Sequence, residues 1–249
     1  ALSLVAACVV SGLLLVFLPL PCGAAFGEAA PGSCPAAAAR RLILTSDGLT
    51  HEALRAEFRA MIGPDASGSS LWYVPTAALG EGLGASFTDS QAAMLQRDFG
   101  FGTVRAIDVA AVQGQALAAE LRELRGLRAV YLESGNTYYL RHHMRASGAD
   151  GHILRLLDAG GVAVGSSAGT IVLGRTVQIA FWKDWDDRSA GGRISVNWSD
   201  PGQAAGLDAC GGRSFLPHAN GRYADRRWQD AQQRRYGHMH EVVRLADGQ

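Results

Sequence analysis

The sequence lacks a charge imbalance and an internal repeat. Lysine plus arginine and aspartate plus glutamate both number 23, so the formal net charge is zero. A chain without a basic excess gives no reason to expect a nucleic acid or an anionic surface as its partner. What remains is a chain of 249 residues, 48% of them hydrophobic, which is enough for one large core. The bulk numbers therefore allow one sizeable core or a single α/β domain.

Cysteines are few, and they do not form a metal-binding pattern. The four are Cys8, Cys22, Cys34 and Cys210, with no C-x-x-C pair and no histidine at the spacing of a zinc ligand. We therefore predict that the chain uses neither a metal nor another cofactor. The sequence leaves open whether Cys34 and Cys210 form a disulfide.

Charge is also missing from the first 27 residues, because the first charged residue is Glu28. An apolar run followed by small residues predicts a signal sequence or an organelle-targeting leader over residues 1–26, and hence a secretory or organellar location. A membrane anchor is the second interpretation, since the run is near the lower limit for spanning a bilayer. A buried core helix is the third. Residues 27–40 are rich in Ala, Pro and Gly, which predicts a linker.

Short apolar runs alternate with amphipathic segments from residue 41 onward. This alternation predicts an α/β domain over 41–249, in which helices cover both faces of a mostly parallel, doubly wound sheet. The sequence stops soon after its last expected strand, so we expect this domain to continue beyond residue 249. The expected strands are 41–45, 71–75, 103–107, 128–132, 162–164, 176–180, 213–218 and 241–245, and the expected helices are 50–61, 89–99, 117–124, 149–157 and 225–235.

The strand at 162–164 leads into Gly165-Ser166-Ser167-Ala168-Gly169. This is a G-x-S-x-G pattern between a strand and a helix. Glycines on both sides allow a turn tight enough to present a serine hydroxyl at the strand end. An ordinary Gly/Ser-rich turn would have the same composition. Ser167 is therefore a candidate nucleophile that needs support from the rest of the chain.

A serine hydroxyl needs a general base, and the base needs an acid that orients it. His218 is the best candidate base, because it follows an expected strand and ligands bind at strand ends in parallel α/β sheets. Asp186 and Asp187 are ranked together as the acid, ahead of Asp184, since all three lie between Ser167 and His218. For the other six histidines, which are His51, His142, His143, His152, His238 and His240, a solvated or capping position is the simpler interpretation.

The oxyanion of a tetrahedral intermediate needs backbone N–H donors. Ala168 follows the nucleophile, and Gly135 ends the neighbouring strand in Glu133-Ser134-Gly135-Asn136-Thr137. The order serine, acid, histidine also occurs in α/β-hydrolases. That class fits poorly, because the chain after Ser167 is too short for the elements that such a fold places there.

Three motifs together resemble the dipeptidase E (α-aspartyl dipeptidase) family of serine peptidases, with cyanophycinase as a more distant relative. They are the turn at Gly135-Asn136-Thr137, the Ser167 elbow and the strand end at Pro217-His218. The resemblance runs from about residue 41 to 245. It implies a fold like that of class I glutamine amidotransferase domains, which are flavodoxin-like, with serine in place of cysteine. It also implies Ser167 as nucleophile, His218 as base, and oxyanion donors at Gly135 and Ala168.

The sequence departs from the family in two places. Glu133-Ser134 stands where glycines are usual, and a carboxylate there would oppose an oxyanion unless it points away. A preference for N-terminal aspartate would also need a basic residue, for which Arg226, with Arg222 and Arg227, is the candidate. Asn136, Thr137 and Arg226 are the residues that we expect to contact substrate.

Three functional hypotheses follow. The first is a serine peptidase that hydrolyses dipeptides or short peptides, with or without an N-terminal Asp preference, through an acyl-enzyme. The second is an amide hydrolase of the same fold that acts on another substrate, as cyanophycinase does. The third is a catalytically impaired binding member, because of Glu133. The partner that we expect is a small peptide substrate, with no nucleic acid, and a membrane is involved only through an uncleaved leader.

Overall fold

The computed structural model describes residues 6–10, 13–17, 39–236 and 241–248. The predicted linker lies almost wholly outside these residues. Of the predicted leader, Ala6–Val10 (β1) and Leu13–Phe17 (β2) are described, and both are strands rather than parts of a helix. They form an antiparallel pair, and β1 continues the sheet beside β3. The targeting role of this segment stays a prediction. Among the described residues, no helix is both long and apolar enough to cross a membrane.

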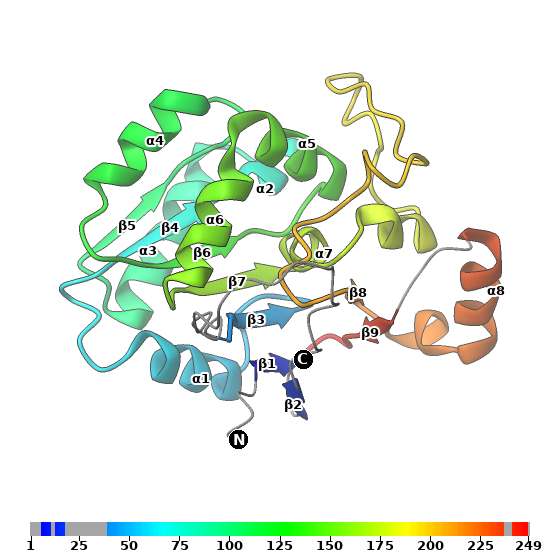
Figure 1. The fold of residues 1–249 in the computed structure, drawn as a ribbon, viewed down its shortest axis with the longest axis horizontal. Coiled ribbons are helices and arrows are strands. Elements are labelled where there is room, and N and C mark those ends of the chain that lie inside the picture. Colours follow the sequence, from blue (N-terminus) through cyan, green and yellow to red (C-terminus); the bar gives the residue numbers. More distant parts are fainter. Residues whose placement is uncertain (1–5, 11–12, 18–38, 237–240, 249) are drawn as a thin grey trace, which may run out of the picture.

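A seven-stranded sheet forms the centre of the domain (Figure 1). The strand order is β2-β1-β3-β7-β6-β4-β5, and every pair except β1 with β2 is parallel. The predicted doubly wound α/β fold is therefore confirmed. Its remaining strands are Arg41–Thr45 (β3), Ser70–Val74 (β4), Thr103–Ala106 (β5), Leu127–Leu132 (β6) and Val162–Ser166 (β7).

Successive side chains of each central strand point to opposite faces and enter two different cores. In β6, Val130 and Leu132 pack with α4, α5, α6 and α7, whereas Ala129 and Tyr131 pack with α1 and α3. Both faces are thus buried, as expected for a parallel sheet. The helices are Glu52–Ile62 (α1), Thr76–Gly80 (α2), Ala85–Phe99 (α3), Gly114–Glu123 (α4), Thr137–Ser147 (α5), Ala149–Asp158 (α6) and Ala168–Leu173 (α7).

The chain after α7 differs from the prediction at one segment. The strand expected over 176–180 is wrong: Thr176 makes one isolated bridge to Ala205, and Val177–Trp182 (η1) is a 3₁₀ helix. The Thr176 side chain accepts the N–H of Gln178, a local cap that starts a helical turn instead of a strand. All six residues of η1 are buried, so the segment shows no polar face in the sequence.

The last strands form a small second sheet. Ser214–Leu216 (β8) and Val242–Arg244 (β9) pair in parallel, with Leu216 opposite Arg244. Figure 1 places them close to α7, away from the outer strands β4 and β5. Between them lie Gly221–Ala224 (η2) and Arg226–Tyr236 (α8), which agrees with the helix expected over 225–235. The active-site candidates are divided between the two sheets.

Candidate active site

Ser167 sits in a strained turn between β7 and α7. Its φ is 46°, in the left-handed region that non-glycine residues rarely adopt. Both flanking glycines are required by close packing. A Cβ on Gly165 would lie 2.7 Å from the Cα of Thr170, and one on Gly169 would lie 2.2 Å from the Leu132 carbonyl oxygen. The G-x-S-x-G pattern thus has a steric cause, because α7 approaches β6 and β7 too closely for any side chain there.

Hydrogen bonds fix this turn to the neighbouring strand β3. The N–H of Ser167 donates to the Thr45 carbonyl at 3.0 Å. The Thr170 hydroxyl accepts the N–H of Thr45 at 3.0 Å, and lies 2.7 Å from the Gly165 carbonyl oxygen and 2.8 Å from that of Thr45. These contacts are buried, so they hold the serine backbone rigidly. A nucleophile on such a support loses little entropy when it reacts.

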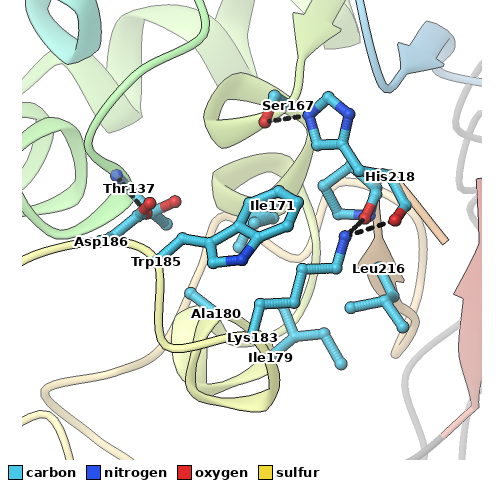
Figure 2. Close-up of a pocket in the computed structure, with 11 residues that line it drawn as sticks. Thr137, Ser167, Ile171, Ile179, Ala180, Lys183, Trp185, Asp186, Leu216 and His218 are labelled. Atoms are coloured by element: carbon cyan, nitrogen blue, oxygen red, sulfur yellow. Dashed lines mark hydrogen bonds between the residues drawn. The ribbon is translucent and has the colours of Figure 1, made fainter. Parts of the chain in front are cut away.

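The structure brings His218 to Ser167. The Nε2 atom of His218 lies 2.9 Å from the Ser167 Oγ, which is hydrogen-bond distance (Figure 2). His218 follows β8, so this contact joins the small sheet to the central one. Its backbone is also left-handed, with a φ of 52°. A general base must reach the proton that it removes, and this geometry meets that requirement.

Ser46 connects three strand ends beneath the histidine. Its hydroxyl accepts the N–H of His218 at 2.9 Å and donates to the Leu245 carbonyl at 3.0 Å. Leu245 in turn accepts the N–H of Ala219 at 2.8 Å. The ends of β3, β8 and β9 are therefore held together by one buried serine, which the sequence analysis did not identify.

The acid that contacts His218 is Asp247, so the expectation of Asp187 or Asp186 is wrong for this contact. The Oδ1 atom of Asp247 lies 2.5 Å from the His218 Nδ1, and its Oδ2 accepts a hydrogen bond from the Asn220 side chain. The reason is the pairing of β8 with β9. Leu216 lies opposite Arg244, so the residues that follow these two strands meet. The observed chain order is serine, histidine, acid.

Asp187 and Asp186 have other partners. The Asp187 carboxylate accepts N–H donors from Gly191 at 2.6 Å and Ser189 at 2.9 Å, and these donors hold its pKa below the usual value. It closes its own turn and is exposed. Asp186 accepts the N–H of Thr137 at 2.8 Å, and burial raises the pKa of its carboxyl. Asp184 pairs with Arg188 at the surface.

The two residues expected to donate to the oxyanion, Gly135 and Ala168, both lie at the carboxyl ends of strands, on the same edge of the sheet as Ser167. Gly135 follows β6 and Ala168 follows Ser167, and β6 is the direct neighbour of β7. Gly135 has a φ of 129°, and a Cβ on it would lie 2.3 Å from the Ala77 carbonyl oxygen, so the position requires glycine.

Glu133 is buried, and both oxygens of its carboxylate accept hydrogen bonds from other protein groups. One carboxylate oxygen accepts the Tyr73 hydroxyl at 3.0 Å, and the other accepts the N–H and hydroxyl of Ser134 at 2.8 and 2.9 Å. Tyr73 belongs to the core beneath α1 and α3. Burial, and after it the charge of Glu133, raises the pKa of Tyr73, so the phenol stays a neutral donor. The carboxylate therefore points toward that core.

A pocket opens beside Ser167 and His218 (Figure 2). Thr137 lines it as expected. Asn136 instead caps α5, accepting the N–H of Tyr139 and donating to the Asp187 carbonyl. Arg226 starts α8 and is exposed, and none of Arg222, Arg226 and Arg227 lines the pocket. The remaining lining residues are Ile171, Ile179, Ala180, Lys183, Trp185, Asp186, Leu216 and Pro217.

Sequence analysis missed Asp247, Ser46 and Lys183. Two late strands were expected, and polar residues follow both of them. Asp247 meets His218 because these strands pair in parallel, which the sequence pattern does not specify. Ser46 looked like an ordinary turn residue after a strand. Nothing in the local pattern marks Lys183.

Comparison with known proteins places this site in a family. The model of peptidase family S51 matches residues 42–249. The chain therefore belongs to peptidase family S51, the dipeptidase E family, and is a serine-type peptidase. The resemblance inferred from the three motifs is confirmed. No curated protein matches the chain.

Two solved structures share the fold. A candidate peptidase E from Listeria monocytogenes EGD-e is 18% identical, with a TM-score of 0.60, over 84% of this chain and 91% of that chain. A peptidase from an acI-B1 Actinobacterium is 15% identical, with a TM-score of 0.56, over 83% of this chain and 80% of that one. At these identities the likeness concerns the fold alone.

Proposed function

We propose that this serine peptidase hydrolyses dipeptides or short peptides through an acyl-enzyme formed on Ser167. The observation that carries the proposal is the continuous chain of contacts from Ser167 Oγ through the His218 ring to Asp247. A serine hydroxyl becomes nucleophilic when a positioned base takes its proton as it attacks. This arrangement supplies the base and the group that orients it.

The proposed reaction begins when Ser167 Oγ attacks the scissile carbonyl carbon while His218 Nε2 accepts its proton. The carbonyl oxygen then carries negative charge, and the N–H groups of Gly135 and Ala168 donate to it. His218 next returns the proton to the leaving amine, which breaks the peptide bond and leaves an ester on Ser167. A water molecule, activated by the same histidine, hydrolyses that ester.

Asp247 has two functions in this scheme. It accepts the N–H of His218 Nδ1, which leaves Nε2 free to accept the serine proton. It also stabilises the imidazolium that forms during attack. Asn220 holds the second oxygen of Asp247, so the carboxylate cannot rotate away from the ring.

Asp186 supports a substrate with a free amino terminus. Within the part of the chain that the structure describes, it is the one carboxylate that lines the pocket beside Ser167, and burial raises its pKa. A bound ammonium group would stabilise the charged carboxylate in this place. A substrate that places its amino group close to the scissile bond is a dipeptide or the end of a short peptide. Among the described residues, the one basic side chain of the lining besides His218 is Lys183, and its ammonium donates to the backbone carbonyls of Pro217 and His218, so we propose no preference for an aspartate side chain.

The contacts of Glu133 favour an active enzyme over an impaired binding member. Three donors hold its carboxylate toward Tyr73 and Ser134. Its charge is therefore already paired with hydrogen bonds, and it is absent from the pocket lining.

The test is hydrolysis of a substrate panel by the wild type and by Ser167→Ala. The panel contains Asp-Leu and Ala-Leu, their N-acetylated forms, cyanophycin and a simple ester. We expect the wild type to cleave the free dipeptides, and Ser167→Ala to lose about 10³-fold or more in kcat. Ser199→Ala, in an exposed loop, is the matched control and should keep wild-type activity.

A fluorophosphonate probe with mass analysis adds a second measurement. Labelling of Ser167 in the wild type, and its absence in Ser167→Ala, would support the acyl-enzyme. Dipeptide hydrolysis that survives in Ser167→Ala would overturn the proposal. Cleavage of cyanophycin without cleavage of dipeptides would favour the second hypothesis instead.

A further inference from the structure

Lys183 is the only lysine in the sequence, where the other 22 of the 23 basic residues are arginines. It follows η1 and lines the pocket beside Ser167 and His218. Its ammonium group, however, is directed at backbone carbonyls and not into the pocket. The Nζ atom donates to the backbone carbonyls of Pro217 and of His218, the latter at 2.6 Å (Figure 2). The lysine thus binds the backbone of the candidate base.

Two aromatic rings complete the surroundings of this ammonium. Nζ lies 4.3 Å from the centroid of the Trp185 ring and 4.7 Å from that of Tyr223. Trp185 donates its indole N–H to the Tyr223 hydroxyl at 3.0 Å, which fixes the two rings relative to one another. A cation held over two ring faces is stabilised without a counter-ion. Two carbonyls thus accept hydrogen bonds from the ammonium group, and two aromatic rings stabilise its positive charge.

The carbonyls that Lys183 binds belong to a strained part of the backbone. His218 has a φ of 52°, a conformation that persists only where its surroundings enforce it. On the amino side, the Ser46 hydroxyl accepts the His218 N–H. On the carbonyl side, the donor is Lys183. The peptide groups before and after the histidine are thus both held by side chains from other segments.

We propose that Lys183 is a positioning residue for His218. By binding the carbonyls of Pro217 and His218, it holds the left-handed backbone that keeps Nε2 within reach of Ser167 Oγ. The alternative for a lysine in a peptidase pocket is to bind a substrate carboxylate, but its donors are already directed at the backbone. This inference rests on the proposed function of Ser167 and His218.

The ammonium charge should matter near neutral pH. Burial lowers the pKa of Lys183 to about 8, although Asp247 and Asp186 oppose the shift. His218 and Tyr223 are the other titratable groups in contact with it. The side chain is therefore charged at pH 7 and becomes neutral as the pH rises through about 8. A neutral amine donates weaker hydrogen bonds and loses the attraction of the rings.

The test compares Lys183→Met and Lys183→Arg with the wild type. Met keeps the apolar stem but removes the donors, and Arg keeps the charge and the donors. We expect kcat for a neutral dipeptide such as Ala-Leu to fall about 30-fold in Lys183→Met, with KM within about twofold, since small misplacements of a base cost this much. The rate of fluorophosphonate labelling of Ser167 should fall in parallel. Lys183→Arg should recover a large part of both.

The pH profile separates positioning from a purely structural role. Wild-type kcat should decline above pH 8, and this decline should be missing in Lys183→Arg, because arginine stays charged. Since the sequence holds one lysine, NMR of protein labelled only at lysine gives one side-chain signal. That signal should titrate near pH 8 and should move when the probe occupies Ser167.

Several outcomes would overturn the inference. One is a wild-type labelling rate in folded Lys183→Met. Another is an effect confined to KM for substrates with an acidic side chain, which would make Lys183 a substrate-binding group. If Lys183→Met does not fold, a lysine NMR signal that does not move when the probe occupies Ser167, together with an unchanged alkaline decline of kcat in Lys183→Arg, would contradict it. Failure of the proposed function is distinguishable, because the wild type itself would then show neither labelling nor hydrolysis.

Discussion

The two halves of the candidate active site stand on two different sheets and are held by different interactions. Ser167 and the proposed oxyanion donors, Gly135 and Ala168, follow strands of the seven-stranded sheet, where backbone packs directly on backbone and glycines allow the approach. His218 and Asp247 belong to the two-stranded sheet of β8 and β9. There, the side chains of Ser46 and Lys183, which come from distant segments, bind the backbone of His218, and the side chain of Asn220 binds the Asp247 carboxylate.

The difference predicts two kinds of failure. Close packing tolerates little change in volume, so damage on the serine side should appear as lost stability. A set of hydrogen bonds at the edge of the domain can lose one member while the fold survives. Damage on the histidine side should therefore appear as lost turnover in a folded protein. Three predictions test this contrast.

The largest effect is expected from Asp247→Asn. An asparagine at this position can favour the wrong histidine tautomer and cannot stabilise the imidazolium, so kcat should fall about 10⁴-fold. The thermal unfolding midpoint should stay within about 2 °C of wild type, because Asp247 is half exposed. Steady-state kinetics on a free dipeptide and calorimetry provide the two measurements.

Asp187→Asn is the matched control for the acid. Its carboxylate is exposed and contacts only its own turn, so kcat should be unchanged. The assignment of Asp247 would fail if Asp187→Asn, rather than Asp247→Asn, abolished turnover.

The second prediction concerns the serine side. In Gly169→Ala, the new Cβ would lie 2.2 Å from the Leu132 carbonyl oxygen, so α7 or β6 must move. We expect a loss of about 3 kcal/mol in the free energy of unfolding, at the upper end of what overpacking costs. Gly151→Ala in α6 is the control, because its Cβ would meet only the end of the flexible Arg155 side chain. Urea titrations compare the two, and equal stabilities would contradict the steric account.

The smallest effect is expected from Asp186→Asn, which lies between the two halves. KM for free dipeptides should rise about tenfold, whereas their N-acetylated forms should be hydrolysed as by the wild type. Because burial raises the pKa of Asp186, its carboxyl gains a proton earlier as the pH falls. Wild-type KM for free dipeptides should therefore increase on the acid side, and Asp186→Asn should lose this dependence. An equal loss of kcat on all substrates would instead indicate a catalytic role for Asp186.

The sequence predicts the Ser167 side of the site better than the His218 side. The elbow around Ser167 and the turn at Gly135 are local patterns whose glycines have steric causes, so they are visible in a few consecutive residues. The parallel sheet is visible for a similar reason, because each buried strand is a short apolar run. These parts of the fold were predicted correctly from the sequence.

The partners of His218 could not be found in this way. Asp247 reaches it only because β8 and β9 pair in parallel, and single-sequence patterns carry no information on which strands pair. The acid was therefore sought among the aspartates between Ser167 and His218. Of these, Asp187 accepts backbone donors of its own turn, and Asp186 accepts the N–H of Thr137 at the start of α5. The strand expected over 176–180 failed because a threonine cap started the 3₁₀ helix η1.

The left-handed backbone at both Ser167 and His218 has a consequence for engineering. Glycine would relax the φ of 46° at one position and of 52° at the other, and such relief of strain is worth about 1 kcal/mol or more. The two side chains that we propose as nucleophile and base thus stand at positions where glycine would stabilise the fold. A library screened for heat resistance alone would drift toward an inactive protein, so activity has to be part of every selection round.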